Sequence, residues 1–234
     1  MAREKWDRFF ATCQDAQIPI NFHIGSGTWE GEVQKWWDSD RQLFKEDGSL
    51  NGPLSVWSST NIFLTNFNTV ANLILAGVLE RFRRLKFVTV ESGVGWIPFV
   101  LESFEYFWDE YMSKIDRAKF TRRPTRSFVE QIYACYWFES RDIVKLYVKK
   151  FRSDNLMFET DFPHPQCIYP NIQENVSQSL AGFTEEVRRK ILYRNAEKVY
   201  GYSLETIKTT EHLQGYSARQ RAEVQERGIH DESR

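Results

Sequence analysis

The chain has 234 residues, a net charge of −1 and a pI near 6.5, so it has no overall positive charge to attract nucleic acid or an anionic membrane. Apolar residues make up 41%, enough for a sizeable core, and none of their runs approaches the roughly 18 that predict a membrane span. Three cysteines without a C-x-x-C pair indicate neither a disulfide framework nor a zinc knuckle, as expected for a cytoplasmic protein.

The first half of the chain predicts two helix–strand pairs separated by a long loop. Apolar positions recur at helical spacing over residues 6–16, and residues 18–23 form a short strand-like run before a Gly-Ser-Gly turn. Residues 28–60 are polar, contain turn signals and four tryptophans, and are predicted to be a lid-like loop insertion. Helical spacing returns over residues 67–84, and residues 86–90 form a β-branched run.

The same alternation continues in the second half. Pro98 suits the first turn of a helix, and the apolar residues 132–138 are predicted to be a third strand. Ser140 is predicted to cap the next helix, which leads to a fourth strand at residues 156–160. Thr184 is predicted to cap a further helix. Strands that alternate with helices indicate an α/β fold with a mainly parallel sheet.

The chain is divided by composition into a folded part and a tail. The pattern of apolar residues fades after residue 204, and eight of the last eighteen residues, 217–234, are charged. Residues 1–204 are therefore predicted to form the folded domain, and residues 205–234 a polar, flexible tail.

Three of the four predicted strands end in a polar residue that a turn-forming residue follows: His23, Glu91 and Asp161. Because the carboxyl ends of parallel strands meet at one edge of a sheet, we expect these side chains to converge. Imidazole and carboxylate together suit a divalent ion such as zinc or manganese, which activates water or polarises a substrate. The alternative is that His23 hydrogen-bonds its own loop and Asp161 caps a turn.

Four segments, in chain order, resemble the second half of the amidohydrolase-related family of metal-dependent hydrolases and decarboxylases: IPINFHIGSG, KFVTVESGVGWIPFVLESFEYFWDE, LMFETDFPHP and RRKILYRNAEKVYGYSL. That family includes aminocarboxymuconate-semialdehyde decarboxylase. The resemblance covers most of residues 5–203 and implies a (β/α)8 barrel of TIM type, represented here by strands five to eight. By this resemblance His23 is the fifth-strand metal ligand and Asp161 the eighth-strand ligand.

The chain also departs from the family's pattern. Glu91 stands where the decarboxylases have a catalytic histidine, and the sequence leaves open whether it is a base, a metal ligand or a loop anchor. His164 is expected to line the pocket and, with Glu91 and Asp161, to assist proton transfer, or else to be structural. The family's His-x-His pair is absent from these 234 residues, so the metal-ligand set is expected to be incomplete and the chain to be a truncated form.

Two functions follow as hypotheses. The first is a metal-dependent hydrolase or decarboxylase that acts on a small carboxylated molecule, with zinc favoured over manganese. The second is a non-catalytic half-barrel that binds a partner or forms a homo-oligomer through its exposed strand edges.

Overall fold

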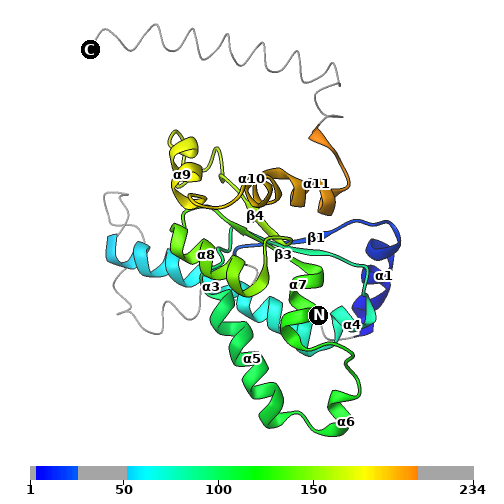
Figure 1. Ribbon diagram of the computed structural model, residues 1–234. Coiled ribbons are helices and arrows are strands. Elements are labelled where there is room, and N and C mark those ends of the chain that lie inside the picture. Colours follow the sequence, from blue (N-terminus) through cyan, green and yellow to red (C-terminus); the bar gives the residue numbers. More distant parts are fainter. Residues whose placement is uncertain (1–3, 26–51, 205–234) are drawn as a thin grey trace, which may run out of the picture. The chain divides into compact units, whose positions relative to one another are not determined.

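The structure, a computed structural model, describes residues 4–25 and 52–204 (Figure 1). Contacts divide the chain into two compact units, Met1–Asn195 and Ala196–Arg234. The predicted tail, 205–234, lies outside the described residues, so the predicted boundary after residue 204 stays a prediction.

The first unit is built on a four-stranded parallel sheet whose strands lie in chain order (Figure 1). The strands are β1 (Ile20–His23), β2 (Phe87–Val90), β3 (Ile132–Tyr136) and β4 (Leu156–Phe158). Each strand pairs in parallel with the next, so a crossover connects every pair. The predicted α/β fold with a parallel sheet is confirmed.

Helices connect the strands and follow the last one. They are η1 (Glu4–Trp6), α1 (Asp7–Asp15), α3 (Gly52–Leu75), α4 (Val78–Arg81), α5 (Ile97–Tyr111), α6 (Lys114–Arg117), α7 (Pro124–Gln131), α8 (Arg141–Phe151), α9 (Ile172–Ser179), α10 (Glu185–Arg189) and the π-helix η2 (Lys190–Arg194). Within these described residues, no helix is both long enough and apolar enough to cross a bilayer. The last described helix, α11 (Asn195–Tyr200), is followed by Gly201, whose N–H donates to the carbonyl of Glu197 at 2.9 Å.

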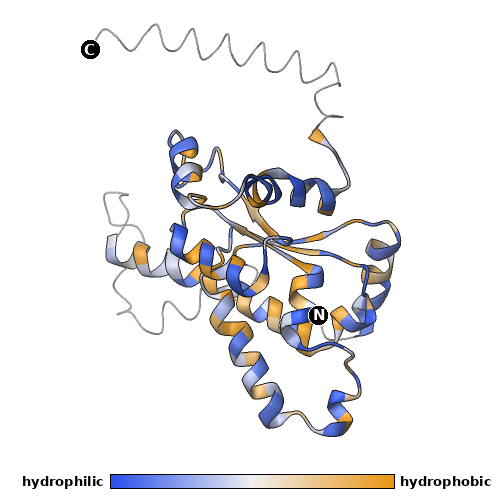
Figure 2. Cartoon of the chain, viewed as in Figure 1, coloured by the Kyte–Doolittle hydropathy of each residue, from blue (hydrophilic) through white to orange (hydrophobic). Residues whose placement is uncertain are grey.

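The two faces of the sheet differ, because side chains alternate along each strand. The register aligns Phe22, Thr89 and Ala134 on one face, where Phe22 and Ala134 belong to the main hydrophobic cluster with residues of α3, α5, α7 and α8. Figure 1 shows these helices on the same side of the sheet, and Figure 2 shows apolar residues along the strands and on these helices. His23 pairs with Val90 on the opposite face, so the candidate site lies away from this helical core.

The prediction of a loop over residues 28–60 is wrong for its last part. Residues 52–60 are the beginning of the 24-residue helix α3, while residues 26–51 lie outside the described residues. Pro53 suits a first helical turn, and the polar side chains of residues 52–60 are three serines and one threonine, which a helix tolerates when apolar neighbours pack. The single helix predicted over 67–84 is two helices, since Gly77 adopts a left-handed conformation (φ +72°) between α3 and α4.

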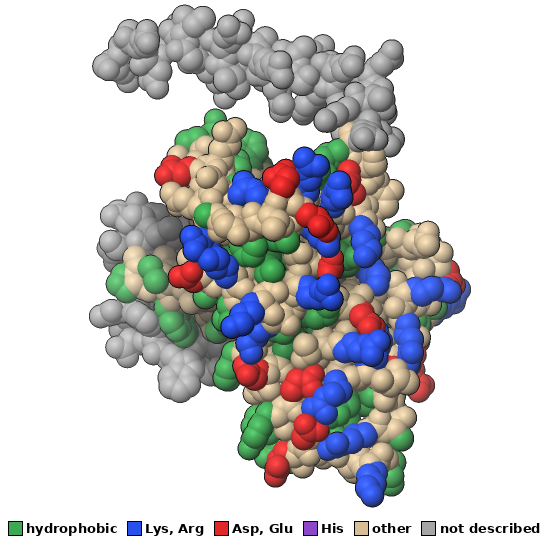
Figure 3. All heavy atoms as spheres, viewed as in Figure 1, with side chains coloured by type: hydrophobic (Ala, Val, Ile, Leu, Met, Phe, Trp, Pro, Cys, Tyr) green, Lys and Arg blue, Asp and Glu red, His purple; other side chains and the backbone are tan. Residues whose placement is uncertain are grey.

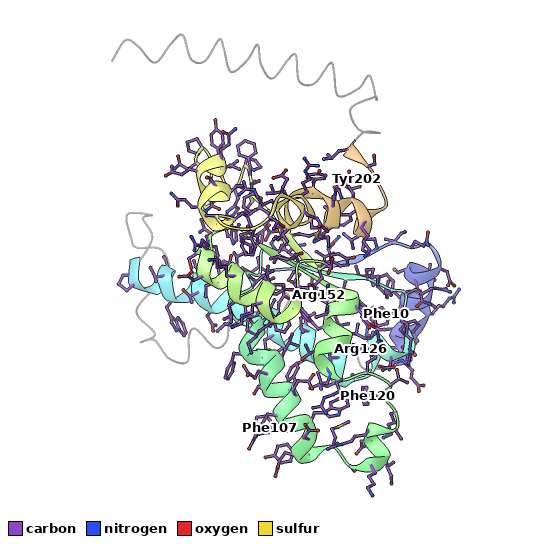
Figure 4. The ribbon with its side chains drawn as sticks, viewed as in Figure 1. Phe10, Phe107, Phe120, Arg126, Arg152 and Tyr202 are labelled. Atoms are coloured by element: carbon purple, nitrogen blue, oxygen red, sulfur yellow. The ribbon has the colours of Figure 1, made fainter. Side chains whose placement is uncertain are left out.

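The surface around α5 and α7 carries charges of both signs, as Figure 3 shows. Arg126, labelled in Figure 4, pairs with Glu130 at 2.8 Å. Arg122, with only 8% of its side chain exposed, bridges Glu130 at 2.8 Å and Glu80 at 3.3 Å. These pairs tie α7 and the loop before it to α4.

Candidate active site

His23 is the last residue of β1, and both of its ring nitrogens have partners. Nδ1 lies 2.9 Å from the carbonyl oxygen of Ile24, and Nε2 lies 3.0 Å from Oε1 of Glu91. Because a carbonyl oxygen only accepts, Nδ1 must carry the proton of this hydrogen bond. In the neutral ring the lone pair is therefore on Nε2, which points to Glu91.

Glu91 directly follows β2 and adopts a left-handed backbone conformation (φ +52°) that is uncommon outside glycine. Its N–H donates to Oε1 of Glu159 at 2.8 Å, which holds this conformation. Burial raises the pKa of the Glu91 carboxyl, and the nearby Asp161 raises it further, while His23 opposes the shift. Glu91 thus contacts both residues that were expected to hold a metal.

Asp161 also has a left-handed backbone (φ +58°) and lies in the turn after β4. Only 8% of its side chain is exposed, and its Oδ2 is buried without a hydrogen-bond partner. Nδ1 of His164 lies 3.2 Å from this oxygen, within ion-pair distance but outside hydrogen-bond geometry. The backbone N–H of His164 donates to the carbonyl of Asp161 at 2.8 Å, so the turn itself sets their spacing.

The structure thus brings all four sequence-predicted residues together, as a continuous series from His23 through Glu91 and Asp161 to His164. Their chemical roles stay predictions. A divalent ion fits two observations: the buried oxygen of Asp161 that has no hydrogen-bond partner, and the tautomer that leaves the lone pair of His23 on Nε2. Within residues 4–25 and 52–204, however, no three His, Cys, Asp or Glu side chains are arranged to hold a metal ion.

Two further carboxylates, Glu159 and Glu139, accept backbone N–H groups of Glu91 and of nearby residues, and the sequence reasoning missed them. Glu159 accepts the N–H of Glu91, and burial raises its pKa to about 8. Glu139 accepts the N–H groups of Val94 at 2.5 Å and Trp137 at 3.2 Å, and burial raises its pKa as well. Glu139 follows the strand predicted over residues 132–138, so the signal that singled out Glu91 could have found it, whereas Glu159 lies inside the strand predicted over residues 156–160.

Comparisons with known proteins agree with this fold. The sequence profile of the amidohydrolase family matches residues 2–202, so the chain belongs to that family. No curated protein matches.

Several solved structures share the fold. An amidohydrolase, map2389c, from Mycobacterium avium subsp. paratuberculosis K-10 is 19% identical with a TM-score of 0.67, over 86% of this chain and 46% of that one. The 5-carboxyvanillate decarboxylase LigW from Sphingomonas paucimobilis is 19% identical with a TM-score of 0.60, and the match covers 86% of this chain and 55% of LigW. A dihydroxybenzoic acid decarboxylase from Polaromonas sp. JS666, with bound manganese and the inhibitor 2-nitroresorcinol, is 14% identical with a TM-score of 0.58. That match covers 86% of this chain and 55% of the decarboxylase. The chain therefore spans about half the length of these structures.

Proposed function

We propose that the chain supplies half of the active site of a metal-dependent hydrolase or decarboxylase that acts on a small carboxylated molecule. The observation that carries the proposal is the meeting of His23, Glu91 and Asp161 at the carboxyl edge of the parallel sheet, with an oxygen of Asp161 buried and without a hydrogen-bond partner. Ligands of α/β folds bind at this edge. In this proposal the four strands correspond to strands five to eight of an eight-stranded barrel.

His23 and Asp161 would hold the ion, through Nε2 and Oδ2 respectively. When bound, zinc or manganese would polarise a substrate carboxylate or carbonyl, or increase the acidity of water. Catalytic zinc sites use three protein ligands, so the proposal requires at least one more from outside the described residues or from another chain. The manganese-bound decarboxylase of the same fold supports manganese, and the mixed nitrogen and oxygen ligands suit either metal.

Glu91 is placed to move a proton. Its raised pKa keeps the carboxyl protonated at higher pH than an ordinary glutamate, so it can donate a proton to a substrate carbon or a leaving group and take one back. Nδ1 of His164 lies 3.2 Å from Oδ2 of Asp161, and His164 would orient that carboxylate or contact the substrate. Neither role selects between hydrolysis and decarboxylation, since both reactions need a proton donor beside the metal.

The substrate class follows by analogy with the decarboxylases of the same fold, which act on hydroxylated aromatic acids according to their names. The test is to supply the purified chain with manganese or zinc and a panel of hydroxybenzoates, and to measure carbon dioxide release. A parallel panel of lactones and amides measures hydrolysis. The proposal expects turnover that Asp161→Asn abolishes and that Glu110→Gln, an exposed position on α5, leaves unchanged. Equal rates for wild type and Asp161→Asn would contradict it.

A second candidate function is self-association through the sheet. Within the described residues β1 and β4 are the edge strands, and such edges pair readily with another chain. Sedimentation of the purified chain tests this candidate. A monomer at micromolar concentration would contradict it, whereas a dimer that Asn21→Pro in β1 disrupts would support it.

A further inference from the structure

Two neighbouring polar residues on α3 are buried. Thr65 is 8% exposed and Asn66 is 0% exposed, on a helix whose 24 residues include no charged side chain. A buried polar side chain is normally kept for the partner that it satisfies. Here the partners lie at the carboxyl ends of β1 and β2.

Thr65 holds the turn that follows His23. Its Oγ1 accepts the N–H of Gly25 at 3.2 Å and donates to the carbonyl of Ile62, one turn back in the helix, at 2.7 Å. Gly25 has φ +80°, and a Cβ at this position would lie 3.3 Å from the side chain of Ile62. The turn is therefore packed directly against α3.

Asn66 links the two strand ends that carry His23 and Glu91. Its amide nitrogen donates to Oγ of Ser92 at 2.5 Å and lies 3.4 Å from the carbonyl oxygens of both Phe22 and His23. Ser92 is 0% exposed, and its hydroxyl donates to the carbonyl of Val90 at 2.9 Å. One side chain thus connects the backbone of His23 to the residue next to Glu91.

Stability alone does not explain an asparagine at this position. Its Oδ1 is buried without a partner, and an unpaired buried acceptor destabilises the folded state. The amide nitrogen, by contrast, contacts the end of β1 and the residue that follows Glu91 after β2. A residue that costs stability while it fixes a strained local geometry is characteristic of a functional site.

We propose that Asn66, together with Thr65, is a positioning residue that sets the distance and orientation of the His23 imidazole relative to the Glu91 carboxyl. This inference rests on the proposed function for its purpose, because the pair that is positioned belongs to the proposed cation site. Asn66 touches neither the substrate nor the metal and acts through the strand ends.

The first test is the nitrogen NMR spectrum of the His23 ring at about pH 8, in protein labelled with 15N histidine and assigned with His23→Gln. The wild type is expected to show one tautomer, with the proton on Nδ1, as the contact with Ile24 requires. Asn66→Ala is expected to give averaged shifts of mixed tautomers, and Thr65→Val, which keeps the side-chain shape, a smaller change in the same direction.

Matched control variants lie on the same helix. Asn68→Ala changes an exposed asparagine. Thr60→Val removes a hydroxyl that, like that of Thr65, donates to a carbonyl one turn back in the helix, in this case that of Val56 at 2.8 Å. Both are expected to give the wild-type His23 spectrum. A spectrum of Asn66→Ala that equals the wild type would overturn the proposal. Should Asn66→Ala fail to fold, Thr65→Val is compared with Thr60→Val instead. A changed His23 spectrum in Thr65→Val alone supports the proposal, and wild-type spectra in both variants overturn it.

The second test is the manganese affinity of the same variants, together with their thermal stability. Asn66→Ala is expected to weaken manganese binding about 10-fold or more, the usual effect of removing a group that orients a ligand, with little loss of Tm. A lower Tm with an unchanged His23 spectrum would mean a purely structural role. If the wild type binds no manganese but the spectrum of Asn66→Ala changes, the proposed cation site fails and the positioning role stands. If the wild type and Asn66→Ala bind manganese equally, the positioning role fails alone.

Discussion

The imidazole Nε2 of His23 and the carboxyl Oε1 of Glu91 lie 3.0 Å apart, although 68 positions separate them in the sequence. The parallel register of β1 and β2 explains this distance, because it pairs His23 with Val90 and so places Glu91 one residue beyond. Two groups that each offer a lone pair when deprotonated cannot remain so close without a shared proton or a cation between them. The pair is therefore suited to proton transfer or to cation binding.

Glu91→Gln is expected to make the protein slightly more stable and its cation site weaker. The folded-state pKa of Glu91 is raised, so its contribution to stability is present at low pH and is lost as the pH rises through that pKa. Glutamine has no such loss, so we expect a small gain in the free energy of unfolding at pH 7, because no charge is then buried and the repulsion by Asp161 is absent. Manganese affinity should fall about 10-fold, measured by calorimetry. Glu110→Gln is the control, and an unchanged affinity in Glu91→Gln would count against a role in cation binding.

Glu159 is expected to make stability depend on pH. Burial raises its folded-state pKa from 4.5 to about 8, so the folded state binds a proton that the unfolded state releases between these values. The stabilisation that the protonated Glu159 contributes is fully present below about pH 4.5 and is lost gradually between about pH 4.5 and pH 8. Over this interval the free energy of unfolding falls by at most about 1.4 kcal/mol per pH unit. Urea unfolding of wild type and Glu159→Gln over this range measures it. The free energy of unfolding of the wild type should fall relative to the variant as the pH rises, and a constant difference would refute the assignment.

Gly93→Ala is expected to destabilise the loop that carries Glu91. Gly93 has φ +61°, and a Cβ there would lie 2.6 Å from Oε1 of Glu139, the carboxylate that binds the N–H of Val94. The left-handed conformation and the displaced carboxylate together should cost about 2 kcal/mol or more. Gly95→Ala is the matched control, since its Cβ would meet only Ile143 at 3.6 Å. Equal unfolding midpoints for both variants would show that the carboxylate moves aside freely.

The sequence predicted the strands well, because each is a short apolar or β-branched run before a turn. The predicted strand at 86–90 is β2 (Phe87–Val90), and the one at 156–160 contains β4 (Leu156–Phe158). The clustering of the strand-end residues also follows from this pattern, since parallel strands all deliver their carboxyl ends to one edge. Thr184 accepts the N–H of Val187 at the start of α10, as its residue type suggested.

Other features depended on tertiary contacts that the sequence does not display. The first part of α3, residues 52–60, contains glycine, proline, serine and threonine with no charge, a composition also typical of loops, and it is helical where a loop was expected. Asn66 lies just before the helix that was predicted over residues 67–84, and only the three-dimensional structure shows that its side chain binds the ends of β1 and β2. The raised pKa of Glu159 likewise requires knowledge of its burial.

The most direct measurement of the central claim is the metal content of the purified chain after equilibration with manganese or zinc, for wild type, His23→Ala and Asp161→Ala. If His23 and Asp161 share one ion, the wild type should retain close to one metal per chain, and each variant should lose most of it while keeping the wild-type circular dichroism spectrum. The claim would be contradicted by a wild type that retains no metal, or by variants that retain as much as the wild type.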